Sequence, residues 1–165
     1  MSENTYKTLL KYGSDIMKTP EFKAAGNQTH HACTTVAEHS ISVALVSIAL
    51  CGVICKLVKA NINMDNVVTA ALCHDLGILG RSDKYKNNFE CLRKHPTDSV
   101  NVYRKMFGEG NERVEDAIKR HMWPLLPTLP HHREGYILTL SDKISSCMER
   151  LGHSPASSLY IKSNE

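Results

Sequence analysis

The sequence predicts an all-α fold, a compact multi-helix bundle formed by one domain. Apolar residues recur at spacings of three, four or seven, which is the period of helices that bury one face. Alternation of apolar and polar residues, which is typical of strands, is almost absent. Glycines and prolines divide the 165 residues into segments of helical length, and a chain of this size buries a sizeable core without disulfides.

The first predicted helix covers residues 5–17, and Leu9, Leu10 and Ile16 are expected to face the core. A proline follows the end of this helix and supports it, because proline cannot continue a helix. Residues 26–33 are polar, and we expect a loop there.

The second predicted helix, residues 36–59, has the clearest start in the chain. Thr35 and Glu38 form the T-x-x-E pattern of a capping box, in which each side chain accepts a hydrogen bond from a free backbone N–H of the first turn. The most apolar part of this helix, residues 41–58, contains two serines, a glycine and a lysine. We therefore interpret it as a buried core helix and not as a membrane span.

Start signals predict two further helices at residues 66–76 and 96–107. Asp65 is the expected cap of the first of these. Pro96 is expected to open the second, because proline is favoured in the first turn of a helix. The polar segment 81–88 is expected to connect them as a loop.

Two more helices complete the predicted bundle. One begins at Asn111 or Glu112, and three prolines between residues 124 and 130 then force an extended loop. The last helix covers residues 134–151 and is followed by a polar, frayed tail. The buried face of the first of these helices is expected to hold Val114, Ala117, Ile118 and His121.

Composition is that of an ordinary globular protein. The net charge is +3 and no dense basic run occurs, so neither a nucleic-acid polymer nor a membrane is an expected partner; a homodimer is compatible with the fold. The N-terminus lacks the apolar segment of a secretory signal. The six cysteines form no C-x-x-C, which predicts reduced thiols in a cytoplasmic protein. Cys51 and Cys55, one helical turn apart, are expected in the core and not on a shared metal.

Four histidines and two aspartates form the candidate metal site. The adjacent pair His74 and Asp75 ends an apolar helix, where a charged aspartate is costly unless it is paired or bound to a metal. By itself the pair is a weak signal, because His74 also suits a helix C-terminus and Asp75 can pair with Arg81. Imidazole and carboxylate donors admit Fe, Mn, Zn, Co and Ni. The six residues are His39, His74, Asp75, His95, His121 and Asp142.

Three segments, VAEHSISVALVSIAL, AALCHDLG and LTLSDKISSCMERL, carry a histidine, a His-Asp pair and a distant aspartate in that order. This order resembles the HD-domain superfamily of metal-dependent phosphohydrolases, and the resemblance covers residues 29–151. It implies hydrolysis of a small phosphate ester, such as a nucleotide, by a metal-activated hydroxide. The matching ligand positions are His39, His74, Asp75 and Asp142.

KHPTDSV and AIKRHMWP extend the resemblance to the subgroup that binds two metals. They place His95 and His121 where that subgroup has the histidines of its second ion. The resemblance then implies that Asp75 bridges both ions, which would be divalent transition metals. The first ion would be held by His39, His74 and Asp142. The alternative without a metal is that His95 is only a residue near a helix start and that His121 is only a cation at a helix C-terminus.

The chain departs from the family pattern at the phosphate-binding lysine. Many two-metal members carry HD-x-G-K, and Ile78 stands at the lysine position here. Arg81 is expected to take over, because its guanidinium fork suits phosphate. Lys143 is a second candidate substrate clamp, and Asp75 is expected to position the attacking hydroxide. The Gly-Tyr-Pro motif of cyclic-dinucleotide phosphodiesterases is absent, which disfavours such substrates.

Two other functions stay open at this point. Some HD-domain proteins use the same six ligands for two irons and activate oxygen, and the ligands alone do not separate the two reactions. A non-catalytic binding module is less favoured, because a scaffold has no need to bury so many charges. His30 and His31 are expected in solvent, or at most at the site entrance. Arg120 is expected on a solvated face or toward phosphate, and Trp123 is expected to pack.

Overall fold

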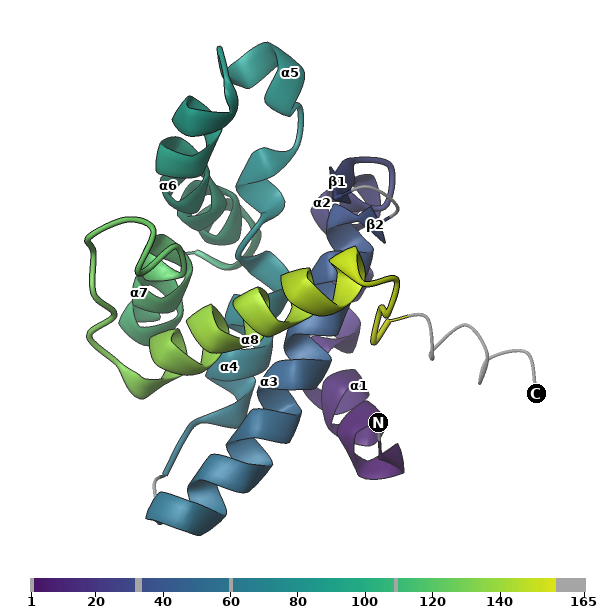
Figure 1. Cartoon of the computed structure of the whole chain (residues 1–165), viewed down its shortest axis with the longest axis vertical. Coiled ribbons are helices and arrows are strands. Elements are labelled where there is room, and N and C mark those ends of the chain that lie inside the picture. The colour runs from purple at the N-terminus through teal and green to yellow at the C-terminus, as the bar shows by residue number, and fades with distance from the viewer. Residues whose placement is uncertain (1, 32–33, 60, 109, 157–165) are drawn as a thin grey trace, which may run out of the picture.

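The computed structural model describes residues 2–31, 34–59, 61–108 and 110–156, and over these the predicted all-α fold is confirmed (Figure 1). Cys33 and residues 157–165 lie outside the described residues, so the predictions for that thiol and for the tail are untested. The helices are α1 (Glu3–Met17), α2 (Pro20–Ala25), α3 (Val36–Val58), α4 (Met64–Cys73), α5 (Arg81–Lys84), α6 (Asn88–Phe107), α7 (Glu112–Arg120) and α8 (Arg133–Arg150). A 3₁₀ turn, η1 (Leu76–Ile78), follows α4.

Helix α3 is the centre of the bundle. It packs against α1, α4 and α8, while α7 contacts both α4 and α8. Helix α6 rests on η1 and α7 and lies at the other end of the molecule from α1 (Figure 1). Since α3, α4, α6, α7 and α8 pack on one another in this way, side chains that are far apart in sequence can meet between them.

The start of α3 is the predicted capping box. The Glu38 N–H donates to Thr35 Oγ1 at 3.2 Å, and the Thr35 N–H donates to Glu38 Oε2 at 2.8 Å. These two bonds satisfy backbone donors that the first turn of a helix otherwise leaves free. They also fix the orientation of the turn that carries His39.

By length and composition, the stretch Val36–Leu57 of α3 is apolar enough to cross a membrane, and half of the scored window is buried inside the protein. The first half of α3 supplies core residues such as Val43 and Leu45. In the second half, Val53 and Leu57 are 55% and 76% exposed. The prediction of a buried core helix therefore holds for the first half of α3, whereas the second half combines the buried Cys51 with these exposed residues.

Two predicted helix starts are wrong. Asn63, not Asp65, caps α4, because its side chain accepts the Asn66 N–H at 3.3 Å. Helix α6 begins at Asn88, and Pro96 lies inside it. Asn87 accepts the Glu90 N–H at 2.9 Å and caps α6, which outweighs the single backbone donor that Pro96 removes.

Three further segments differ from the prediction. Leu10 is 54% exposed, because it points away from the face that carries Leu9 and Ile16. The predicted loop after α2 contains an antiparallel hairpin of β1 (Thr29–His31) and β2 (Thr34–Thr35), whose strands are too short to show alternation. The segment expected to connect the third and fourth helices holds the short helix α5.

Candidate metal centre

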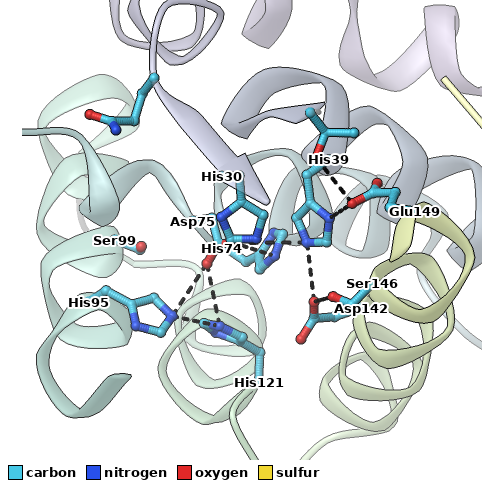
Figure 2. A network of polar contacts seen from close by, with 12 residues as sticks. His30, His39, His74, Asp75, His95, Ser99, His121, Asp142, Ser146 and Glu149 are labelled. Atoms are coloured by element: carbon cyan, nitrogen blue, oxygen red, sulfur yellow. Dashed lines mark hydrogen bonds and ion pairs between the residues drawn. The ribbon is translucent and has the colours of Figure 1, made fainter. Parts of the chain in front are cut away.

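The structure brings the six predicted ligands together in one buried site (Figure 2). His39 comes from α3 and Asp142 from α8, while His95 lies in α6 and His121 at the end of α7. Each of the six is at most 7% exposed. Helices from the whole length of the chain therefore contribute to a single centre.

His74 and Asp75 can face the same centre because the helix ends between them. His74 is the C-cap residue of α4, and Asp75 precedes η1 with φ −110° and ψ 6°, outside the helical region. In a continuous helix, consecutive side chains point about 100° apart. The break allows His74 Nε2 to lie 3.3 Å from Asp75 Oδ2.

The carboxylate of Asp75 divides the site into two halves. On one side, Oδ2 lies 3.3 Å from His74 Nε2 and 3.9 Å from His39 Nε2. On the other side, Oδ1 lies 3.3 Å from His95 Nε2 and 3.6 Å from His121 Nε2. One carboxylate therefore presents a different oxygen to each set of imidazoles, which is the arrangement of a bridging ligand.

Hydrogen bonds on the outer side of each imidazole set its tautomer. Three Nδ1 atoms lie within hydrogen-bond distance of backbone carbonyls, which only accept, so each Nδ1 carries the proton and Nε2 carries a lone pair. His39 Nδ1 lies 2.9 Å from the Glu149 carboxylate in the same way. The three carbonyl pairs are His74 with Ala71 (2.8 Å), His95 with Cys91 (2.9 Å) and His121 with Ile118 (2.6 Å).

The Nε2 atoms placed in this way converge on one another and on the carboxylates. His95 Nε2 and His121 Nε2 face each other at 3.0 Å. His39 Nε2 lies 3.2 Å from Asp142 Oδ1, and the buried His74 Nε2 makes no hydrogen bond within the described residues. In the metal-free protein a proton lies between His39 and Asp142, and a divalent transition metal fits this set of nitrogen and carboxylate donors in place of such a proton.

Three overlapping groups of these side chains have ligand atoms that all lie within 4.8 Å of one another. These separations are close to twice the length of a metal–nitrogen or metal–oxygen bond, which is about 2.0–2.2 Å, so each group could hold one ion. The groups are His39 with His74 and Asp142, His74 with Asp75 and His121, and His30 with His39 and Asp75.

Both aspartates stay ionised in this site. Burial opposes the charge of Asp75, but the charge of His74 and the close approach of the His74 and His95 imidazoles hold its pKa well below the ordinary value. Burial likewise opposes the charge of Asp142, and its hydrogen bond with His39 and the charges of His74 and Lys143 lower its pKa. The centre thus offers two ionised carboxylates to a cation at neutral pH.

The histidines respond in opposite directions to the same surroundings. Burial lowers the pKa of His39, but hydrogen bonds to Asp142 and Glu149 outweigh it and raise the pKa to about 10. Burial and the charges of His74 and His95 lower the pKa of His121 to about 3. In the metal-free protein at neutral pH, His39 is therefore protonated and His121 is neutral.

Metal binding at neutral pH is expected to release at least the one proton that His39 holds in the metal-free protein. Because the pKa of His39 is raised to about 10, protons compete with the metal throughout the range below that value. The affinity should rise with pH between 6 and 9, by up to about tenfold per unit. Calorimetric titration in buffers of different ionisation enthalpy measures the proton count, and an affinity that falls with rising pH contradicts this prediction.

A cavity of about 400 Å³ opens onto the centre. Its lining includes cationic and apolar side chains and five residues of the centre, His30, Asp75, His95, His121 and Asp142. The cationic residues on its wall are Arg81, Lys143 and Arg150. Arg81 Nη2 donates to Asn88 Oδ1 at 2.7 Å, so it does not take the alternative partner Asp75. Lys143 Nζ donates to Asp142 Oδ2 at 2.6 Å, which places a cation directly beside the centre.

Two residues of this centre were not predicted from the sequence. His30 was expected in solvent or at the entrance, yet its side chain is only 9% exposed and its Nε2 lies 3.4 Å from Asp75 Oδ2. Its position depends on the unpredicted hairpin. Glu149 orients His39 and lies seven residues after Asp142 on α8, which is two helical turns. That spacing is visible in the sequence and would have placed Glu149 on the same face.

The remaining candidates lie outside the centre. Arg120 donates to Asp116 at 2.6 Å, so its charge is paired and does not face a phosphate. Trp123 packs edge-to-face on Tyr136, in agreement with a packing role. Cys51 is buried and Cys55 half-buried, both as free thiols.

Comparison with known proteins identifies the family. Residues 36–147, more than half of the chain, match the family described as HD domain. The matched segment contains all six predicted ligands, from His39 to Asp142. No curated protein and no solved structure matches the chain.

Proposed function

We propose that this chain, which belongs to the HD-domain family, is a metal-dependent phosphohydrolase that cleaves a small phosphate ester in the cytoplasm. The observation that carries the proposal is the placement of Asp75, whose two oxygens face two separate sets of imidazole nitrogens. Divalent ions at such a site neutralise developing charge on a phosphoryl group and lower the pKa of a coordinated water. We propose His39, His74 and Asp142 as ligands on one side of Asp75, and His95 and His121 on the other.

The chain's own residues would then orient the substrate. Lys143, held beside the centre by Asp142, is placed to contact a phosphoryl oxygen. Arg81 stands at the cavity wall with its guanidinium fixed by Asn88, so that its remaining N–H groups are available to a second phosphate oxygen. These two cations take the place of the family lysine that Ile78 replaces.

The cavity supports a small substrate in preference to a polymer. Its volume of about 400 Å³ is in the range of small-molecule sites. Part of its lining is apolar and can hold a ring or an alkyl group, while the cations Arg81, Lys143 and Arg150 suit an anionic head. The apolar residues are Ile78, Leu92, Met122 and Leu125.

The proposal is tested by the metal content of protein purified without oxygen. The wild type is expected to hold about two ions per chain, and His95→Ala about one, because only the Oδ1 side of Asp75 loses a donor. His153→Ala is the matched control, since the His153 side chain is exposed and bonds only the nearby Leu151 carbonyl in the described structure. One ion in the wild type, with no loss in His95→Ala, would contradict the two-ion site.

The reaction class is tested on the same preparations. Release of inorganic phosphate or of an alcohol from a panel of phosphate esters is expected, with His95→Ala slower and His153→Ala unchanged. Oxygen consumption by an iron-loaded sample, with no ester hydrolysis, would replace the hydrolase by an oxygenase that uses the same ligands.

A further inference from the structure

We propose that His30 is a seventh metal ligand, in addition to the six predicted ones, and that it lies on the Oδ2 side of Asp75. This inference rests on the proposed metal site and adds a donor to one half of it. The ion on that side would have five protein donors: His30, His39, His74, Asp75 and Asp142. The ion on the other side would have three: His95, His121 and Asp75.

The backbone of the hairpin accounts for the placement of His30. Thr29 pairs with Thr35 and His31 pairs with Thr34, so strand β1 contains one more residue than strand β2 between the two pairs. That extra residue is His30, which makes this a β-bulge. A bulge bends its strand and re-aims a side chain, and bulges are frequent beside active sites.

The hairpin is fixed to the rest of the centre on both sides. The Val36 N–H donates to Gln28 O at 2.9 Å, which ties β1 to the start of α3. The Gly80 N–H donates to Gln28 Oε1 at 3.3 Å, which ties the same residue to the segment after η1. The bulge is therefore held between the helix that carries His39 and the turn that follows Asp75.

The side chain of His30 has the geometry of the other donors. Its Nε2 lies 3.4 Å from Asp75 Oδ2, close to the 3.3 Å of His74 Nε2 from the same oxygen. Its ring lies 4.4 Å from the ring of His39, and the ligand atoms of His30, His39 and Asp75 all lie within 4.8 Å of one another. Figure 2 shows His30 beside His39 and His74 on one side of Asp75, opposite His95 and His121.

An unequal site has a chemical consequence. Five protein donors leave one position of a six-coordinate ion open, whereas three leave three positions open. The substrate would then bind the ion on the His95 and His121 side, where the cavity also has its apolar residues Leu92 and Met122. The ion on the His30 side would act mainly on the attacking water.

The experiment compares His30→Ala and His30→Gln with wild type, with His95→Ala as a ligand variant of the opposite side and His153→Ala as a surface control. Metal-free proteins are titrated with Co²⁺, and both the affinity and the visible absorption of the bound ion are recorded. Circular dichroism of the metal-free proteins establishes whether each variant is folded. If His30→Ala is not folded, His30→Gln still tests the proposal, because it keeps a polar side chain of similar length.

The expected result for both His30 variants is a loss of at least about tenfold in the affinity of one ion, with a changed Co²⁺ spectrum, while the second ion binds as in wild type. His95→Ala should affect the other ion, and His153→Ala neither. Wild-type affinities and spectrum in both His30 variants would overturn the role of His30 and leave the proposed function intact. A wild type that binds no Co²⁺ would overturn both.

Discussion

Asp75→Asn is expected to remove both metal ions and to reduce activity by about 10³-fold or more. The carboxylate presents one oxygen to each set of imidazoles, so its loss affects both halves of the site. An amide oxygen carries no formal charge, so neither ion would have the negative charge that the Asp75 carboxylate supplies between the two sets of imidazoles. Loss of metal removes several kcal/mol of transition-state stabilisation, which sets the magnitude.

Metal content and phosphate release measured on the same sample check this prediction. Asp15→Asn is the matched control, because Asp15 is exposed at the surface and pairs only with Lys18 in the described structure. It makes the same chemical change far from the centre and should leave both quantities as in wild type. Two ions per chain in Asp75→Asn would show that Asp75 does not bridge.

Gly77→Ala is expected to destabilise the fold by about 3 kcal/mol, at the upper end of the usual cost of overpacking. A Cβ at Gly77 would lie 2.5 Å from both His95 O and Ser99 N, which are backbone atoms of α6 and cannot rotate away. The Gly77 N–H also donates to Ser99 Oγ at 2.9 Å. Helix α6 must move outward, and His95 moves with it.

Urea unfolding of the metal-free protein measures the stability, and Co²⁺ titration measures the effect on the His95 side of the centre. Gly52→Ala is the control, since a Cβ at Gly52 in α3 meets nothing within 4 Å. That variant should gain about 0.5–1 kcal/mol from helix propensity. If the two alanine variants are equally stable, η1 and α6 are not packed as closely as described.

Local signals in the sequence predicted much of the helical structure, and their failures have local causes. The capping box of Thr35 and Glu38 lies within one turn, so the residues that form it are neighbours in the sequence and their spacing is sufficient evidence. At α6 two local signals competed. Pro96 predicts a helix start, but Asn87, nine residues earlier, accepts the Glu90 N–H and is the cap that the structure uses.

The six candidate ligands were identified from their residue types, their places beside apolar segments and the resemblance to the family. The resemblance implied that the six residues lie in one site, and the structure brings their side chains together there. His30 was misplaced because its orientation depends on a bulge in a hairpin whose strands have three and two residues. No periodicity can appear in so short a strand.

The sequence by itself determined which of the longer segments are helical and where most of them end. These properties follow from periodicity and end signals that act over a few residues. Only the tertiary structure decided which oxygen of Asp75 faces which imidazole, that Glu149 orients His39, and that His30 enters the site. Such contacts join residues up to 110 positions apart, and their geometry is set by the packing of whole helices against one another.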